Sequence, residues 1–553
     1  MIAEAHAVAA SGPIEADLCI VGGGAVGLTL AHALRNSGAE IVLLESGAEA
    51  FDKAANELNA GAVADGSAHP PPSLYRQRGL GGSTRIWGGR CVPYEPLDFE
   101  TRPGLRDGWP IPFAEVARFY PEANAYCDAG EADFDGDTAL PTREAFIGGF
   151  ADDKVLTRSL ERFSLPTHFG RRLRADLAKA ATVKVLTQAT ALRFTLTADG
   201  AATSVIAATS GGTELTVRAK AFVAAVGGLE VVRLLGVSIP SAAPAHDHLG
   251  RHYMCHLEGA FGELALRPAR RPVAFGFERT KDGVYARRRL TISEGVQRTD
   301  GLLNLAVRLH HPNVVDPRHG LGVLSAMYVT KQLILPEYRR KLSMVEHALA
   351  AQMPSGASFW LAHGRNLVFD APRTAAFAVD WTVRRYLMKR RIPYVALRSA
   401  AGVYPLDFNA EQLPCPNSRV SLASETDRLG LPRLKVDWRF TETDIASVAA
   451  SYRLMRDAFA RSGVAELRLP DGKLEDHLAA AAIPVGGHHI GVARMSTDPR
   501  QGVTAPDGRL HGSPNLYVSG AATFPTSSHA NPTLTAVALA LRLAETLKTR
   551  LTA

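Results

Sequence analysis

A glycine-rich turn between an apolar strand and a helix constrains the fold of this chain more than any other feature. Residues 17–21, DLCIV, predict a buried strand. LTLAHALRNSG then predicts a helix that ends at Gly38, and EIVLLE predicts a second strand. Between the first strand and the helix, Gly22, Gly24 and Gly27 have the spacing G-x-G-x-x-G. The order strand, turn, helix, strand predicts an α/β fold with a parallel sheet.

This turn has a ligand-binding interpretation as well as a structural one. Glycines at these places let the backbone approach a pyrophosphate, which then lies on the helix N-terminus. Glu45 ends the second strand about 20 residues beyond the turn, where an acid accepts a hydrogen bond from a ribose hydroxyl. The alternative is a tight turn in an α/β domain without a ligand. The agreement of all the elements favours a dinucleotide site.

Length, charge and cysteine usage narrow the class of protein. A chain of 553 residues predicts two domains, or one large domain with an insert. Its net charge of +7 is mild and shows no basic stripe, so nucleic-acid binding is not expected. The five cysteines are odd in number and lack CxxC spacing, so neither disulfides nor a metal site is expected. Reduced thiols, and a start without signal-peptide features or a membrane-spanning apolar run, favour a cytoplasmic protein.

A second glycine cluster runs from Tyr75 to Glu100 in the sequence YRQRGLGGSTRIWGGRCVPYEPLDFE. Its paired glycines can lie flat against a planar ligand, with hydroxyls, an aromatic face and positive charge beside them. The alternative is a flexible surface loop, which the tryptophan and the paired glycines disfavour. The predicted cofactor contacts in this loop are Arg78, Gly81, Gly82, Ser83, Trp87, Gly88, Gly89 and Arg90.

The middle of the chain changes in character near residue 260. TVKVLTQATALRFTL, from Thr182, predicts paired strands, and AKAFVAAVGGLEVVRLLGVS predicts a strand, a Gly227–Gly228 turn and a helix. Beyond that point the sequence lacks glycine turns and predicts an antiparallel sheet with helices. We therefore expect a discontinuous nucleotide-binding domain of residues 14–260 and 471–553, and a substrate-binding domain of residues 261–470.

A basic amphipathic segment lies within the expected substrate domain, over residues 376–391. Ala376, Val379, Val383 and Leu387 recur at helical spacing, with arginines and lysine between them. The segment is either a contact with a membrane surface or an acidic partner, or a solvated helix of the substrate domain. We favour the solvated helix. Further on, the adjacent residues at 411 and 412, glutamate and glutamine, either line a cleft or serve the structure.

The C-terminal segment contains the residues best suited to chemistry. VGGHHIGVARM places His488 beside His489, and adjacent side chains do not share a face of a helix or strand. PNLYVSGAATFP then predicts a strand and a loop. HANPTLTAVALALRLAETLK predicts a buried helix with Asn531 as N-cap and Pro532 as its first residue.

With these motifs in order, the chain resembles the glucose–methanol–choline (GMC) oxidoreductases over nearly its whole length. GGST..WGG, followed by DFE and GWPI, is most similar to their bacterial sugar-dehydrogenase and pyranose 2-oxidase-like branch. The resemblance implies a Rossmann-like FAD-binding domain. In pyranose 2-oxidase, a histidine after Ser-Thr binds the flavin covalently; here Arg85 follows Ser83-Thr84, so we expect non-covalent FAD. The further cofactor contacts that it implies are Ala189, Thr190, Gly227, Gly228, Gly520, Ala521, Asn531, Pro532, Thr533 and Leu534.

The resemblance also assigns the catalytic pair. The family has a histidine three residues before a glycine, here Gly491, followed by Arg-Met; this places His488 at the catalytic position. The second catalytic position, at the start of the final helix, falls on Asn531. His489 and His529 lie one and two residues outside these positions, and we assign them to neighbouring or substrate contacts. The structural alternative for His488 is a hydrogen-bonded core histidine.

These residue types suit alcohol oxidation. FAD accepts a hydride at N5 while a neutral imidazole, with an ordinary pKa near 6.5, takes the hydroxyl proton. An amide N–H can stabilise the developing alkoxide, and a helix N-terminus favours the negative charge of reduced flavin. The resemblance thus predicts oxidation of a CH–OH group, in particular a secondary hydroxyl of a sugar, glycoside or polyol.

The sequence leaves several alternatives open. Members of the family also carry out natural-product tailoring, lyase or decarboxylase reactions, and a non-catalytic FAD-binding subunit is a rival of another class. The electron acceptor is oxygen, a quinone or an electron-transfer protein, and we favour a dehydrogenase over an oxidase. Export together with a partner subunit remains compatible with the sequence.

Overall fold

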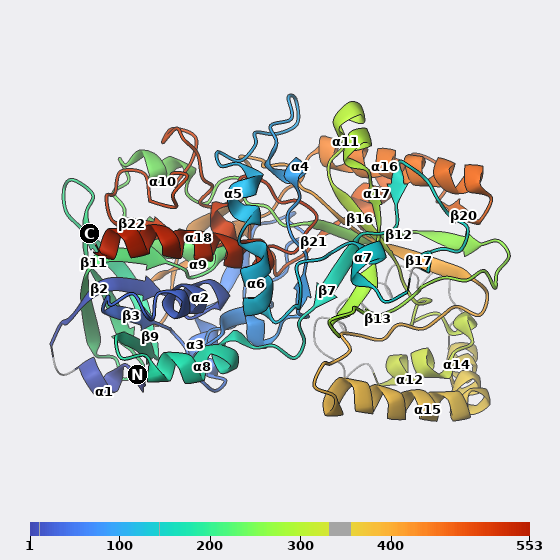
Figure 1. The fold of residues 1–553 in the computed structure, drawn as a ribbon, viewed down its shortest axis with the longest axis horizontal. Helices are drawn as coiled ribbons and strands as arrows, with labels where there is room; N and C mark the ends of the chain where they lie inside the picture. Colours follow the sequence, from blue (N-terminus) through green and yellow to red (C-terminus); the bar gives the residue numbers. More distant parts are fainter. Residues whose placement is uncertain (10–11, 143, 331–355, 553) are drawn as a thin grey trace.

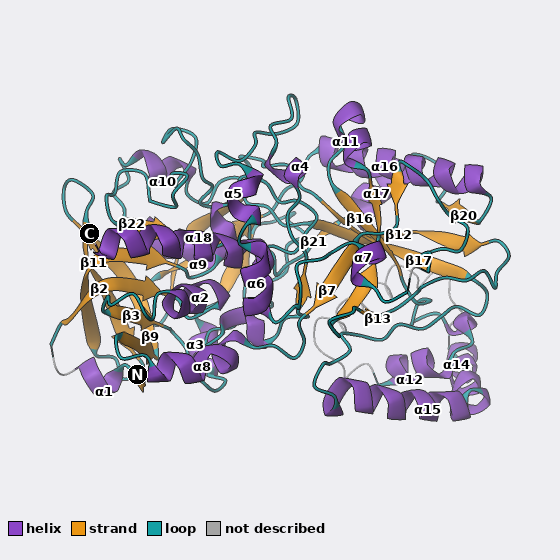
Figure 2. Cartoon of the chain, viewed as in Figure 1, coloured by secondary structure: helices purple, strands orange, loops and turns teal. Residues whose placement is uncertain are grey.

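A computed structural model describes residues 1–9, 12–142, 144–330 and 356–552. Figure 1 shows two halves side by side, with both chain termini in the left half. The left half contains a mainly parallel sheet with helices over it, and the right half an antiparallel sheet. Figure 2 shows this division by element type, with the loops between the halves forming the junction.

The first sheet is the α/β unit that the sequence predicts. Its strand order is β1-β8-β3-β2-β11-β10-β9, with β22 also paired to β11. Neighbours are parallel from β1 to β11 and at β22, and antiparallel at β10 and β9. The strands are β1 (Ile2–Glu4), β2 (Ile14–Val21), β3 (Ile41–Leu44), β8 (Val183–Thr187), β9 (Ala189–Leu196), β10 (Ala202–Thr209), β11 (Glu214–Ala224) and β22 (Leu516–Val518). The segment from Thr182 forms two strands as predicted, but β8 and β9 pair with other strands.

Helices cover both faces of this sheet. The C-terminal helix α18 (Thr533–Thr552) packs against α2 (Ala25–Ala33) and α6 (Tyr120–Cys127), as Figure 1 shows. Leu534, Val537 and Leu541 of α18 are buried in this layer, which explains the almost wholly apolar sequence of its first half. On the other face lies α9 (Gly228–Gly236), which follows β11 after the predicted glycine turn.

In the second sheet, every pair of neighbouring strands is antiparallel. Its order is β20-β12-β17-β16-β15-β6, with β21 also paired to β12. The strands are β6 (Val155–Leu156), β12 (Leu257–Leu266), β15 (Leu290–Ile292), β16 (Leu305–Leu309), β17 (Val403–Ala410), β20 (Ala465–Arg468) and β21 (Ile483–Pro484). The long helix α16 (Glu442–Ser462) begins with a capping box and covers one face.

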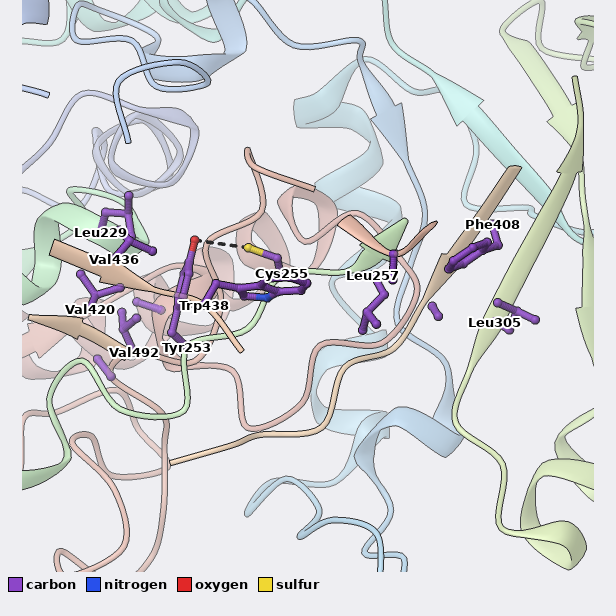
Figure 3. Close-up of a cluster of buried hydrophobic side chains, with 14 of the residues drawn as sticks. Leu229, Tyr253, Cys255, Leu257, Leu305, Phe408, Val420, Val436, Trp438 and Val492 are labelled. Atoms are coloured by element: carbon purple, nitrogen blue, oxygen red, sulfur yellow. Dashed lines mark hydrogen bonds between the residues drawn. The ribbon is translucent and has the colours of Figure 1, made fainter. Parts of the chain in front are cut away.

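One apolar core continues from the first half into the second. Figure 3 shows Leu229 of α9 at one end and Phe408 and Leu305 of the antiparallel sheet at the other. Tyr253 and Cys255 lie between them and are joined by a hydrogen bond of 3.2 Å. The segment around residues 253–257 therefore spans the junction between the halves.

Two small sheets complete the strand architecture, and they connect the expected domains. One has the order β13-β14-β7-β5 and the other β18-β19-β4. Their strands are β4 (Gly61–Val63), β5 (Arg90–Cys91), β7 (Leu160–Phe163), β13 (Glu278–Arg279), β14 (Tyr285–Arg288), β18 (Arg419–Thr426) and β19 (Pro432–Asp437). Both sheets contain strands from the predicted nucleotide-binding segment, 14–260, and from the predicted substrate segment, 261–470.

The basic amphipathic segment, residues 376–391, forms the end of α15 (Ala371–Thr382) and a π-helical turn, η4 (Val383–Leu387). Two further helices, α12 (Gly322–Val329) and α14 (Ala357–Phe369), pack beside α15 at the edge of the right half, below the antiparallel sheet in Figure 1. The segment is helical as predicted, but its apolar face does not pack inward: Val379 is 66% and Leu387 75% exposed. No helix in the described ranges has the length and apolar character to cross a bilayer.

The remaining helices are short and lie mostly in connections. They are α1 (His6–Ala9), α3 (Lys53–Glu57), η1 (Gly82–Arg85), α4 (Pro96–Phe99), α5 (Phe113–Ala117), α7 (Gly136–Ala139), α8 (Phe169–Lys179), α10 (Pro244–His248), α11 (Glu294–Asp300), η2 (Pro317–His319), α17 (Leu474–Ala481) and η5 (Ala521–Thr523). The five cysteines are free thiols, and four of them are buried.

Candidate active site

The glycine turn after β2 is built so that two of its glycines admit no side chain. Gly22 has φ +108°, and a Cβ there would lie 2.5 Å from the carbonyl oxygen of Ala225. A Cβ on Gly27 would lie 1.9 Å from the carbonyl oxygen of Gly22. Gly24 is different, because a Cβ there would meet no protein atom within 4 Å. Backbone atoms therefore pack tightly against the turn at Gly22 and Gly27, whereas the turn is open at Gly24.

The N-terminus of α2 lies at this open position. Its N-cap, Gly24, has no side chain to cap the helix, and Ala25 and Val26 of the first turn are only half-buried. The first N–H groups of a helix need partners from outside the helix. Accessible donors at a helix N-terminus form an anion site, as the G-x-G-x-x-G spacing predicts.

Glu45 joins the two glycine loops. Its buried carboxylate accepts hydrogen bonds from the backbone N–H groups of Gly23 at 2.7 Å, Gly47 at 2.9 Å and Gly79 at 2.8 Å. The second loop is fixed further by a 2.8 Å bond from Gly81 N–H to the Gly23 carbonyl. Glu45 thus holds the loops together, and its predicted bond to a ribose hydroxyl stays a prediction.

Three of the predicted cofactor contacts, Arg78, Ala189 and Thr190, gather at the end of β3. Arg78 donates from Nη1 to Ser46 Oγ at 3.0 Å, and Ser46 bonds Thr190 Oγ1 at 2.7 Å. Ala189 donates its backbone N–H to the Glu45 carbonyl at 2.9 Å. Three segments that are distant in the sequence therefore meet beside Glu45.

Trp87 and Ser83, also in the second glycine loop, lie in different surroundings. Trp87 donates its indole N–H to the Thr167 carbonyl at 2.9 Å and packs edge-on against Phe169. The exposed Ser83 accepts at Oγ from Gln77 N–H at 3.3 Å. Neither contact tests the predicted role of these residues toward a cofactor.

The second glycine loop also contains Gly88, Gly89 and Arg90, and Arg90 contacts residues of the antiparallel sheets. Arg90 forms an ion pair of 3.1 Å with the buried Glu161 of β7, which also pairs with Arg308 of β16. Together these arginines hold the pKa of Glu161 down, to about 2, against the effect of burial. Gly89 has φ +68°, whereas Gly88 faces open space. Arg90 therefore anchors the loop to the antiparallel sheets.

The C-terminal motifs meet the two dinucleotide turns. Gly491 donates its N–H to the Ala521 carbonyl at 3.1 Å. A Cβ on Gly228 would lie 2.3 Å from the carbonyl oxygen of His489. A Cβ on Gly520 would lie 3.8 Å from a side chain in the first turn of α2. Predicted cofactor residues that are distant in the sequence thus lie close together.

Helix α18 begins one residue later than predicted. Its first residue is Thr533, and Pro532 precedes it and accepts at its carbonyl from Ala536 N–H at 2.9 Å. Asn531 is therefore not the N-cap. Its side-chain Nδ2 instead lies 2.9 Å from His488 Nε2. The amide contacts the histidine instead of capping the helix.

The contact between Asn531 and His488 shows which ring nitrogen of His488 is unprotonated. An amide nitrogen only donates, so His488 Nε2 is the acceptor and carries a lone pair. A lone pair that faces an amide donor is the arrangement needed to take a proton from a hydroxyl while the amide bonds the same oxygen. The structure brings the two predicted catalytic residues together.

His256 is a third member of the site that no sequence motif revealed. Its Nδ1 lies 2.7 Å from His488 Nδ1, and its Nε2 lies 3.0 Å from the carbonyl oxygen of Ser527. The ring is fully buried, and burial lowers the pKa of His256 to about 4. His256 immediately precedes β12, where YMCHLEG shows no recognisable spacing. Only the tertiary structure brings it to His488.

His489 belongs to a separate hydrogen-bond chain. His69 Nδ1 lies 2.6 Å from the Pro70 carbonyl, which only accepts, so His69 Nε2 accepts from the Tyr253 hydroxyl at 2.9 Å. That hydroxyl must then accept from His489 Nδ1 at 2.7 Å, which leaves a lone pair on His489 Nε2. Nε2 is buried without a hydrogen-bond partner among the described residues. It is an acceptor that suits a hydroxyl or N–H group of a bound ligand.

His529 is held away from the catalytic pair. Its Nε2 lies 2.5 Å from Nη1 of the buried Arg289, which can only donate. Burial, together with the charge of Arg289, keeps the pKa of His529 well below its usual range. The imidazole of His529 thus contacts Arg289. Glu411 and Gln412 are buried structural residues: Glu411 pairs with two arginines, and Gln412 accepts from Cys255 N–H.

The residues present fit FAD. The open face of Gly24, the uncapped start of α2 and the buried acceptor on His489 offer contacts to a pyrophosphate and to hydroxyl or N–H groups. Among the described residues, no group of three or more His, Cys, Asp or Glu is placed to hold a metal ion.

Comparison with known structures supports the fold. The chain is similar to pyridoxine 4-oxidase from Mesorbium loti, with a TM-score of 0.51 at 18% identity, covering 96% of this chain and 98% of that one. It is also similar to a variant formate oxidase of Aspergillus oryzae RIB40, with a TM-score of 0.54 at 15% identity, covering 98% and 99%. At these identities the likeness concerns the fold alone.

Curated relatives match over shorter segments. C-glycoside 3-oxidase of Microbacterium trichothecenolyticum is 28% identical over 148 residues, which are 26% of this chain and 27% of the relative. The large subunit of fructose dehydrogenase of Gluconobacter japonicus is 32% identical over 152 residues, 27% of this chain and 26% of the relative. The matched segment thus spans about a quarter of each relative.

Two family profiles match the chain. The profile described as FAD dependent oxidoreductase matches residues 17–306, more than half of the chain, and includes the turn after β2 and both glycine loops. The profile described as GMC oxidoreductase matches residues 414–540, which contain His488 and Asn531. The chain belongs to the FAD-dependent oxidoreductases and, within them, to the GMC oxidoreductase family.

Proposed function

We propose that the chain oxidises a CH–OH group of a small molecule, with His488 as the base and Asn531 as the donor that holds the reacting oxygen. The observation that carries the proposal is the 2.9 Å contact between Asn531 Nδ2 and His488 Nε2. It sets an unprotonated ring nitrogen against an amide donor, next to the segments that fit the cofactor. A substrate hydroxyl that enters this contact can donate to the imidazole and accept from the amide at once.

Each residue then has a defined task. FAD, when bound, supplies the acceptor for the hydride that leaves the substrate carbon. His488 removes the hydroxyl proton at Nε2, and Asn531 donates an N–H to the oxygen as negative charge develops there. The N–H groups of Thr533 and Leu534 lie in the first turn of α18, where a helix favours a facing negative charge.

A polar sheet face beside His256 supports a substrate rich in hydroxyl groups. Glu258 is paired across β12 and β17 with Asn409, and Asp407 of β17 is paired with Arg308 of β16. Side chains alternate along a strand, so these residues share the face opposite the apolar layer of Leu257, Phe408 and Leu305 in Figure 3. Arg308 donates to Asn409 Oδ1 at 2.7 Å. Carboxylate, amide and guanidinium groups are the partners that hydroxyls need.

The names of the relatives agree with this class of substrate. Besides the C-glycoside 3-oxidase and the fructose dehydrogenase, they include a 2-methyl-1,2-propanediol dehydrogenase and a paromamine 6'-oxidase. With the resemblance stated above, we propose a secondary hydroxyl of a sugar, glycoside or polyol as the site of oxidation. We also propose residues 261–470 as the substrate-binding unit and residues 14–260 with 471–553 as the FAD-binding unit.

The experiment is a panel of sugars, glycosides, polyols and simple alcohols with an artificial dye as electron acceptor. Turnover with at least one polyhydroxylated compound is expected, and under anaerobic conditions that compound should bleach the flavin. Dithionite serves as the control, because it reduces a bound flavin whatever the function. If dithionite bleaches the flavin and no alcohol in the panel does, the chain is a non-catalytic FAD-binding protein or has another flavin chemistry.

Two further properties follow from the same proposal. The acceptor is a quinone, dye or electron-transfer protein, so oxygen uptake should be slow beside dye reduction; fast uptake in an oxygen electrode would make the enzyme an oxidase. The FAD is held without a covalent bond, since Arg85 stands where the related loop has a histidine. Acid precipitation should leave the yellow flavin in the supernatant, and flavin in the pellet would show a covalent bond.

A further inference from the structure

His256 belongs to a hydrogen-bond chain that includes the catalytic base. The chain runs from the Ser527 carbonyl oxygen to His256 Nε2 at 3.0 Å, from His256 Nδ1 to His488 Nδ1 at 2.7 Å, and from His488 Nε2 to Asn531 Nδ2 at 2.9 Å. The two imidazole rings meet edge to face, with centroids 4.8 Å apart. Every ring nitrogen of the pair thus has a partner.

We propose that His256 is a positioning residue that fixes His488 in the tautomer with its lone pair at Nε2. This inference rests on the proposed function of His488 as base. The Ser527 carbonyl can only accept, so His256 carries its proton on Nε2. A neutral imidazole has one N–H, so His256 Nδ1 accepts from His488 Nδ1–H. The proton of His488 is thereby held on Nδ1, and Nε2 is left to receive the proton of the substrate.

His256 must be neutral to accept a hydrogen bond from His488, and its surroundings keep it neutral. A protonated ring would donate from both nitrogens and could not accept from His488. Burial is the main cause of the lowered pKa of His256, about 4. The ionisable groups that act on its titration are Glu258 of β12, which follows it, Arg308 of β16, Glu411 after β17, and His529, whose pKa His256 influences in turn.

The backbone around both histidines is rigidly paired, so the contact is part of the fold. Met254 and Ile490 exchange backbone hydrogen bonds of 2.9 and 3.0 Å, and Val485 N–H donates to the His256 carbonyl at 3.0 Å. Ser527 is fixed by two bonds with the backbone of Gln412, at 2.8 and 3.0 Å. His256 is thus held between two segments of paired backbone, and its ring is already placed to bond His488.

Two nearly isosteric substitutions separate positioning from packing. In His256→Asn, the Oδ1 atom stands near the place of Nδ1 and can accept from His488 Nδ1–H. His256→Leu fills a similar volume and accepts nothing. We expect the leucine variant to reduce flavin about 10- to 100-fold more slowly, because a charge-assisted hydrogen bond to the base is lost as it gains its proton. The asparagine variant should stay within about threefold of the wild type. A packing role would slow both variants alike.

The pH profile gives a second readout. An acceptor at Nδ1 stabilises the protonated form of His488, so its removal should move the acid limb of the flavin-reduction rate to lower pH in the leucine variant only. His363→Leu is the matched control, because His363 is equally buried but bonds Ser325, far from the site. It should leave the profile unchanged. An unchanged acid limb in His256→Leu would overturn the proposal.

The tautomer itself can be observed without any substrate. Nitrogen-15 histidine NMR of the holoenzyme, with His488 assigned by the signals lost in His488→Gln, should show protonated Nδ1 and unprotonated Nε2 in the wild type and in His256→Asn. In His256→Leu only the Asn531 donor still favours the lone pair at Nε2, so the other tautomer should become populated beside the first. If no alcohol is oxidised yet the tautomer depends on position 256, the function is wrong and the positioning stands. If alcohols are oxidised and the tautomer is the same in both variants, the positioning is wrong.

Discussion

Asn531 offers the sharpest separation between a catalytic and a structural role. The sequence predicts it as an N-cap, whereas the structure turns its amide to His488 Nε2 at 2.9 Å and leaves α18 to begin at Thr533. The two assignments predict opposite effects for Asn531→Leu, a change to a side chain of similar shape that removes the donor. Loss of a helix cap would lower the free energy of unfolding by about 1 kcal/mol and leave the rate of flavin reduction unchanged. Loss of a catalytic donor would slow flavin reduction and change the free energy of unfolding little.

The size of the kinetic effect follows from the charge on the reacting oxygen. A donor to a fully charged oxyanion contributes about 2.7–4 kcal/mol, or 10²- to 10³-fold in rate. A donor to a neutral group contributes about 0.5–1.5 kcal/mol. Since the alkoxide only develops as the proton moves to His488, we expect a value between these limits, about 30- to 300-fold.

The assay is anaerobic stopped-flow reduction of the flavin by the best substrate of the panel, with urea unfolding of the same preparations. Asn531→Leu should lower the limiting reduction rate about 30- to 300-fold while the free energy of unfolding changes by less than about 0.5 kcal/mol. Asn531→Asp is the companion variant, because its ionised carboxylate accepts and cannot donate, so it should be at least as slow. A rate within threefold of the wild type, or a stability loss typical of a cap, would refute the assignment.

Three more outcomes follow from the structure. Gly24→Val should fold normally but bind FAD at least about tenfold less tightly, because its side chain enters the open space before α2; Gly295→Val, at an equally open glycine of α11, should bind FAD as the wild type does, and equal flavin titrations of the two variants would contradict this. Glu411→Leu should lower the free energy of unfolding by about 3–5 kcal/mol, since two buried arginines lose their shared partner, and urea titration measures it. Burial holds the pKa of His256 near 4, so below about pH 6.5 the unfolded chain takes up a proton that the native ring refuses. Wild-type stability measured against His256→Asn should therefore fall by up to about 3 kcal/mol between pH 7.5 and 4, and a constant difference would contradict the buried neutral ring.

The parts of the fold that follow from sequence are those with a local cause. The turn at Gly22 and Gly27 is specified by backbone approach that only glycine allows, and the buried strand before it by its unbroken apolar run. His488 and Asn531 are assigned by the resemblance to the GMC family, through the spacing from Gly491 and the start of the final helix. The start of α18 was misplaced by one residue because a capping amide and a catalytic amide look alike in sequence.

The parts that do not follow from sequence depend on distant contacts. His256 reaches His488 across 232 positions, through a pairing of two segments that no periodicity predicts. The ion pairs of Arg90 with Glu161, and of Glu411 with its arginines, link elements from both halves. The apolar face over Val379 and Leu387 has helical spacing, which predicts a helix but not which way that face turns.

The central claim is that the His488 imidazole removes the substrate proton while hydride leaves carbon. Rapid mixing of anaerobic His488→Ala holoenzyme with the best sugar or polyol tests it most directly, with FAD content and dithionite reduction equal to those of the wild type. If His488 is the base, flavin reduction in His488→Ala should be at least about 10²-fold slower than in the wild type. Reduction at the wild-type rate would contradict it.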